Sequence, residues 1–210
     1  MNNEQLLEDR QPILSIATKP RETIQLLLQY KSFRYFIIVG LIGTFASQLG
    51  GFIGTKYPRP LTLGDIVLSS MANSVLFFFL ATAFSAGMYK FFGLIFKGKG
   101  SFKDLFKVVS LATIPYIWIL PLLLFWMQLS PETYFVFSQE MTMEEMIIRF
   151  TGGGVFLIFT IWSAVITIVG VSEVHKISKW KAFFVSIIGF VIIVALLFVG
   201  IAVFGISYFM

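Results

Sequence analysis

Long uncharged segments alternate with short charged ones along the chain. Five runs of at least 20 residues contain no Asp, Glu, Lys, Arg or His. A helix needs about 20 apolar residues to cross the roughly 30 Å hydrocarbon core of a bilayer. The pattern predicts an all-α polytopic membrane protein, a bundle of five transmembrane helices with short interfacial helices. The predicted spans are residues 35–54, 66–89, 108–129, 153–172 and 182–206.

Residues 1–34 are predicted to form a cytoplasmic tail ahead of the membrane domain at residues 35–210. Thr18 can cap a helix whose first turn contains Pro20. The apolar residues that share one face of this helix are Ile24, Leu27 and Leu28. Two interpretations stay open. The helix lies on the inner leaflet through this face, or it is the ordinary lead-in to the first span.

Lys and Arg are unevenly distributed between the segments that join the spans. Of the 16, 13 lie in the tail and in the second and fourth loops, against three in the first and third loops. Basic residues are retained on the cytoplasmic side of membrane proteins. The N-terminus is therefore predicted to be cytoplasmic and the C-terminus outside. The formal charge of +5 divides into about +7 on the inner face and −2 on the outer face.

Composition agrees with a membrane protein and excludes several classes. The chain is 57% hydrophobic and only 13% charged, where a soluble domain has about 25% charged residues. So few polar residues cannot cover the surface of a soluble globular protein. The composition therefore excludes a soluble enzyme, a disordered chain and a nucleic-acid-binding domain. There is no Cys, and His175 is the single His, so thiolate and multi-histidine metal sites are excluded.

The second loop alternates basic and aromatic residues. Lysines near an anionic leaflet contribute about 1 kcal/mol each, and a phenylalanine can enter the acyl boundary. One hypothesis is a surface that contacts anionic headgroups or a protein partner; the alternative is a loop that only determines topology. The candidate contact residues are Lys97, Lys99, Ser101, Phe102 and Lys103.

The same loop contains an incomplete phosphate-binding motif. Gly93, Gly98 and Lys99 match the opening of G-x-x-x-x-G-K, but the Ser or Thr that should follow is replaced by Gly100. The motif also follows a membrane span rather than a strand. Nucleotide binding is rejected, and Gly98 and Gly100 are interpreted as a flexible turn between helices.

Local patterns predict how some helices begin and pack. Thr142 and Glu145 have capping-box spacing, which predicts a short outer helix before the fourth span, with a bend at Gly152–Gly154. In the first span, small residues recur every four positions, from Gly43 to Gly51 and from Ala46 to Gly54. Such faces let helices approach closely in lipid. The first and second spans are expected to pack together, or this face forms a homodimer.

The third span contains Pro115 and Pro121. Each removes a helical hydrogen bond and favours a kink. Two kinks could line a cavity, as in transporters, or they could be packing irregularities of the bundle. The spans contain no ionisable residue, which argues against a proton-coupled pump.

The fourth loop contains Glu173 and His175 at the cytoplasmic boundary. Glu173 is three residues from Lys176, so the two can pair on one helix face. His175 could sense pH, or it is a solvated or lipid-facing histidine. Residues two positions apart diverge on a helix, which argues against Glu173 and His175 as a catalytic acid–base pair.

The whole pattern resembles the Yip family of multipass proteins, the Ypt/Rab-interacting (Yip-one) domain, over roughly residues 12–205. The segments that carry the resemblance are Lys19-Pro20-Arg21, Gly98-Lys99-Gly100-Ser101-Phe102, Pro115-Tyr116, Glu173-Val174-His175-Lys176 and Trp180-Lys181-Ala182. The form is similar to the shorter bacterial members. The resemblance implies five spans in a bacterial plasma membrane, with a cytoplasmic N-terminus. Eukaryotic members are associated with Rab-type GTPases, but their Asp-Leu-Tyr-Gly-Pro type motif is missing here.

The distinctive residues gather in the cytoplasmic loops rather than in the spans. The sequence therefore favours a non-enzymatic scaffold, or a membrane-organising or trafficking-type factor. The alternative is a small channel or facilitative transporter that uses the third span. No catalytic, cofactor-binding or metal-binding residue is expected. The expected partners are the bilayer, anionic headgroups and a protein at the cytoplasmic loops, but not nucleic acid.

Overall fold

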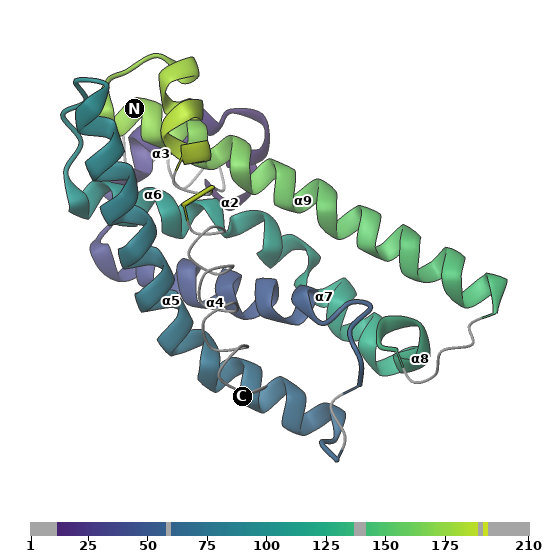
Figure 1. Cartoon of the computed structure of the whole chain (residues 1–210). Helices are drawn as coiled ribbons and strands as arrows, with labels where there is room; N and C mark the ends of the chain where they lie inside the picture. Colours follow the sequence, from purple (N-terminus) through teal and green to yellow (C-terminus); the bar gives the residue numbers. More distant parts are fainter. Residues whose placement is uncertain (1–11, 58–59, 137–141, 189–190, 193–210) are drawn as a thin grey trace, which may run out of the picture.

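The computed structural model describes residues 12–57, 60–136, 142–188 and 191–192. These residues form α-helices, with no β-strand among them (Figure 1). Residues 179–188 are also helical. The helices are α2 (Pro12–Thr18), α3 (Pro20–Tyr30), α4 (Phe33–Gly51), α5 (Leu63–Ile95), α6 (Phe102–Ala112), α7 (Ile114–Leu129), α8 (Pro131–Tyr134) and α9 (Met143–His175).

Four segments of the described chain are long and apolar enough to cross a membrane. They are α4, α5, the α6–α7 segment Phe102–Leu129, and α9. Each of the first four predicted spans falls largely within one of them. The fifth, at residues 182–206, lies mostly outside the described residues, and its first turns are helical. The prediction of an all-α polytopic membrane protein is confirmed.

The helices α5 and α9 are longer than the predicted spans. Each has 33 residues, or about 50 Å at the α-helical rise. That length exceeds the hydrocarbon thickness, so both helices project beyond it. The extension of α5 leaves only residues 96–101 as the connection to α6. Several lysines of the second loop therefore stand on helices.

The N-terminus of α9 bears out one local prediction and corrects another. Thr142 and Glu145 form the predicted capping box. They cap α9 itself, so the prediction of a separate short outer helix is wrong. The glycines at 152–154 do not interrupt the helix either. At Gly152 the small residue admits the Trp126 ring, because a Cβ there would lie 2.2 Å from the indole.

The third span is divided at Thr113, which ends α6 and precedes α7. The interruption comes two residues before Pro115, which occupies the first turn of α7, where its missing N–H is not needed. Pro121 lies inside a continuous α7. Pro115 is buried and Pro121 exposed, so the two prolines do not face one common interior.

Small residues of α4 admit neighbouring helices, and α4 packs against α5, as expected. A Cβ at Gly40 would overlap the Phe78 ring of α5. At Gly43 it would lie 2.1 Å from the Thr113 hydroxyl, where α6 meets α7. The small face of α4 thus also accommodates the break in the third span.

The end of the bundle that carries α8 is held by two polar side chains. The Tyr134 hydroxyl donates to the Leu49 carbonyl at 2.6 Å. Burial raises the pKa of the Tyr134 phenol, so it remains a donor. The Arg149 guanidinium donates to three carbonyls of residues 132–135, at 2.6–3.0 Å. These bonds tie α8 to α4 and α9.

Candidate functional site

The basic segments of the chain meet at the end of the bundle opposite α8. Figure 1 shows α3, the connection between α5 and α6, and the C-terminal end of α9 together at this end. We call it the basic end. Its described Lys and Arg residues are Lys19, Arg21, Lys31, Arg34, Lys90, Lys97, Lys99, Lys103, Lys107, Lys176, Lys179 and Lys181.

The predicted helix of the N-terminal tail is α3, and it is part of the packed bundle. Its N-cap residue is Lys19; Thr18, the predicted cap, is instead the last residue of α2. Ile24 and Leu27 are fully buried, in a cluster that includes residues of α4, α6 and α9. The apolar face of α3, which could have contacted lipid, is therefore covered by other helices of the protein.

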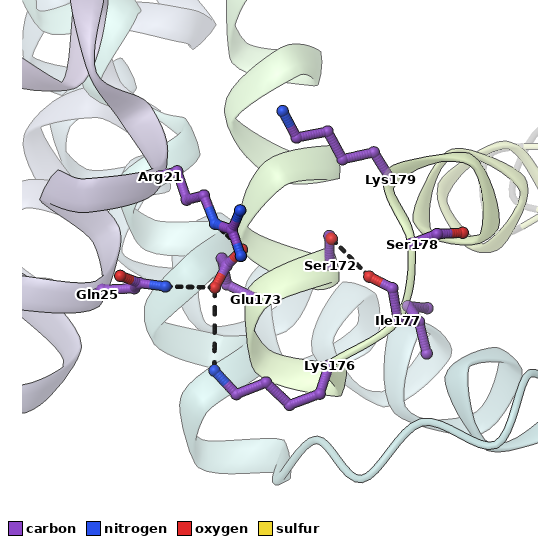
Figure 2. A pocket seen from close by; sticks show the side chains of 8 residues that line it. All are labelled: Arg21, Gln25, Ser172, Glu173, Lys176, Ile177, Ser178 and Lys179. Atoms are coloured by element: carbon purple, nitrogen blue, oxygen red, sulfur yellow. Dashed lines mark hydrogen bonds and ion pairs between the residues drawn. The ribbon is translucent and has the colours of Figure 1, made fainter.

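Glu173 holds α3 against α9. Its side chain is only 6% exposed, and its carboxylate pairs with Arg21 Nε and accepts a hydrogen bond from Gln25 Nε2 (Figure 2). Lys176 Nζ lies farther away, 3.9 Å from the carboxylate. The sequence predicted only the Lys176 pair. Arg21 and Gln25 were missed because about 150 residues separate them from Glu173.

His175 faces the opposite direction, toward the α5–α6 connection. Its Nδ1 accepts a hydrogen bond from the Gly100 N–H at 3.0 Å, and its Nε2 lies 3.0 Å from the Tyr89 carbonyl. An acceptor at Nδ1 and a carbonyl at Nε2 require the neutral ring with its proton on Nε2. At 1% exposure His175 is not solvated or lipid-facing, so that expectation is wrong. The divergence from Glu173 follows the prediction.

Three glycines surround the His175 ring. A Cβ at Gly93, Gly98 or Gly100 would lie 2.2, 2.4 or 2.9 Å from ring atoms. All three are buried. The glycines of the incomplete phosphate-loop pattern therefore enclose a histidine, and Gly98 and Gly100 lie in a turn between two helices, as predicted. The chain turns at Lys97, whose φ of 61° lies in the left-handed region.

The candidate contact residues divide into structural and exposed ones. Ser101 caps α6, since its hydroxyl accepts from the Asp104 N–H at 3.1 Å. Lys103 Nζ lies 5.9 Å from the centroid of the Phe33 ring, and Phe102 is 41% exposed. The Lys97 and Lys99 side chains are exposed, and the Lys99 backbone N–H donates to the His175 carbonyl at 3.2 Å.

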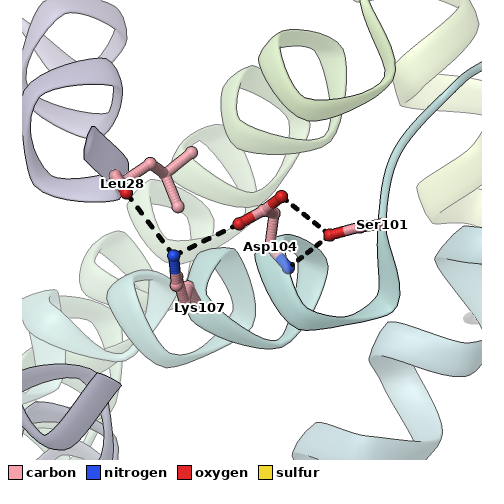
Figure 3. A network of polar contacts seen from close by, with 4 residues as sticks. All are labelled: Leu28, Ser101, Asp104 and Lys107. Atoms are coloured by element: carbon pink, nitrogen blue, oxygen red, sulfur yellow. Dashed lines mark hydrogen bonds and ion pairs between the residues drawn. The ribbon is translucent and has the colours of Figure 1, made fainter. Parts of the chain in front are cut away.

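Lys107 is structural rather than a surface cation. It is 8% exposed and donates to Asp104 at 3.2 Å and to the Leu28 carbonyl at 3.4 Å (Figure 3). Its ammonium group also lies 5.4 Å from the centroid of the Phe36 ring. The sequence placed this lysine only by topology. Its partners on α3 and α4 could not be inferred.

Comparison with known proteins identifies the family. A family model described as the Yip1 domain matches residues 14–202. No curated protein and no solved structure matches the chain. The matched segment covers nearly the whole chain, including every described transmembrane helix, the α5–α6 connection and the Glu173–His175 region. The chain belongs to the Yip family of multipass membrane proteins, whose Yip1 domain it carries.

Proposed function

We propose that this protein is a non-enzymatic scaffold that associates with an acidic partner protein or anionic headgroups through the turn between α5 and α6. The observation that carries the proposal is that Lys97 and Lys99 are exposed in a turn held in place by His175, with exposed Lys103 just after it at the start of α6. The glycines of the turn are packed against a buried ring that is hydrogen-bonded on both sides. A pre-ordered turn loses little conformational entropy when its side chains bind.

Replacing Lys97, Lys99 and Lys103 with Gln should weaken this association. Each lysine contributes about 1 kcal/mol near an anionic surface, so the triple variant should bind about a hundredfold more weakly. Two readouts apply. Crosslinking in the native membrane captures partner proteins, and the purified protein in nanodiscs is tested for binding to vesicles that contain phosphatidylglycerol.

A matched control is needed because any loss of three charges weakens electrostatic association. The variant with Lys19, Lys90 and Lys181 changed to Gln removes the same charge from the same end of the bundle. If both triple variants lose binding equally, the turn has no special role. Solute flux through the purified protein in liposomes would instead favour the channel or facilitator hypothesis.

The basic end is proposed to face the cytoplasm, with α8 on the outer side. This orientation rests on the distribution of Lys and Arg. A reporter that is active only in the cytoplasm should work when inserted between residues 97 and 99 and should fail when fused after Met210. Activity after Met210 would contradict the proposed topology.

A further inference from the structure

A polar pocket opens at the basic end between α3 and the chain that follows α9. Its volume is about 380 Å³, and Glu173 lines it whereas His175 does not. Figure 2 shows Lys179 on the far side of the pocket from Arg21 and Glu173. The polar side chains that line it include Arg21, Gln25, Glu173, Lys176, Ser178 and Lys179.

Positive charge exceeds negative charge in this pocket. Three cations, Arg21, Lys176 and Lys179, line the pocket together with one carboxylate, that of Glu173. Glu173 is nearly buried and already accepts from Gln25 and from Arg21 Nε. This carboxylate orients Arg21 and reduces the local charge, but it leaves a net charge of about +2.

The cationic groups keep unused donors. Arg21 pairs through Nε, so its terminal amino groups have no hydrogen-bond or ion-pair partner among the described residues, and its side chain is 64% exposed. Lys176 is 71% exposed, with its carboxylate partner 3.9 Å away. The Lys179 ammonium group makes no hydrogen bond or ion pair with the described residues. Arg can donate two parallel hydrogen bonds to a phosphate, and Lys supplies a compact charge.

The pocket lies next to a residue typical of the membrane interface. Trp180 follows Lys179 directly and is 75% exposed. Exposed Trp side chains gather at the depth of the headgroups. Ser172, the last residue of the uncharged run, also lines the pocket. The cations are thus placed where the apolar part of α9 ends.

We propose that this pocket binds a phosphate group, carried by an anionic phospholipid headgroup or by a soluble phosphate. Arg21, Lys176 and Lys179 are its ligands, and Glu173 positions Arg21. The site is separate from the Lys97–Lys103 turn of the proposed function, because the two share no residue. Either source presents the same oxyanion to the same donors.

The test uses the full-length protein in detergent. Native mass spectrometry measures its affinity for dioctanoyl phosphatidic acid, and thermal unfolding measures stabilisation by inorganic phosphate. Changing Lys176 and Lys179 to Gln should weaken lipid binding about thirtyfold. The control changes Lys90 and Lys181 to Gln, which removes equal charge outside the pocket and outside the Lys97–Lys103 segment and should leave the affinity near that of the unaltered protein. Lys179→Gln alone should weaken binding about fivefold, and it breaks no hydrogen bond or ion pair with the described residues.

The two arms separate the sources. Phosphatidic acid binding that depends on Lys176 and Lys179, without stabilisation by inorganic phosphate, supports a lipid headgroup. Stabilisation by inorganic phosphate that the pocket variant abolishes supports a soluble phosphate. An equal loss of affinity in the pocket and control variants would mean that the lipid binds through diffuse surface charge alone, and it would overturn the proposal. So would an unaltered protein that binds neither probe.

Discussion

Replacing Gly93 with alanine is expected to destabilise the protein by about 2 kcal/mol, although alanine is the better helix former. A Cβ at this position would lie 2.2 Å from His175 Cε1 and 2.3 Å from Nε2. The ring has little freedom to move away, because it is hydrogen-bonded to Gly100 and near the Tyr89 carbonyl. Its displacement would strain the core and lose at least one buried hydrogen bond.

The same helix offers a matched control. Gly87 also lies in α5, but a Cβ there would meet no atom within 4 Å. Gly87→Ala should therefore stabilise the protein by up to about 1 kcal/mol through helix propensity. Denaturation in detergent micelles compares the two variants. Equal stability of Gly93→Ala and Gly87→Ala would contradict the packing account.

Introducing Gly93→Ala into a His175→Ala protein tests whether the His175 ring causes the loss of stability. In that protein the space that the new methyl group needs is already empty. Gly93→Ala should then be neutral or stabilising, which is a strong coupling between the two positions. If Gly93→Ala is equally harmful with and without the ring, the His175 contact is not responsible.

Arg21→Gln is the second substitution with a large expected effect. It removes the close cationic partner of a carboxylate that is only 6% exposed. Gln25 and the distant Lys176 remain, and an incompletely compensated buried group costs roughly 1–3 kcal/mol. The loss should appear as release of α3, measured by faster hydrogen exchange at residues 20–30 and by a lower midpoint of thermal unfolding.

The two partners of this pair should respond unequally. Glu173→Gln leaves Arg21 unpaired, but the Arg21 side chain is 64% exposed and is hydrated by solvent. The effect of Glu173→Gln should therefore be smaller than that of Arg21→Gln. Arg34→Gln, at an exposed position without a described side-chain partner, controls for loss of charge. A larger effect for Glu173→Gln than for Arg21→Gln would contradict this account.

Hydropathy and local spacing were sufficient for much of the architecture. The cost of placing charged groups in hydrocarbon confines them to the ends of the spans, so the uncharged runs locate α4, α5 and α9. The capping box at Thr142 was recognisable for a similar reason, since both partners lie within one helical turn. Helix ends were less predictable: α5 continues to Ile95 because helices also extend through the polar boundary.

The candidate site depended on contacts that no local pattern contains. The sequence placed the lysines near one another and predicted that Glu173 and His175 diverge. It also predicted a turn at Gly98 and Gly100, but the buried ring that these glycines enclose is evident only in the folded chain. Lys107 was counted as a loop cation, but α3 and α4 surround it.

The difference between the two groups of features has a physical origin. The bilayer acts on each segment separately, so spans, capping boxes and the uneven charge of the loops can be recognised from neighbouring residues. Apart from Lys176, the partners of Glu173 and His175 come from segments about 75 to 150 residues away in the chain. Their meeting depends on how α3, α5, α6 and α9 pack, through side-chain shape and hydrogen bonds that periodicity does not encode.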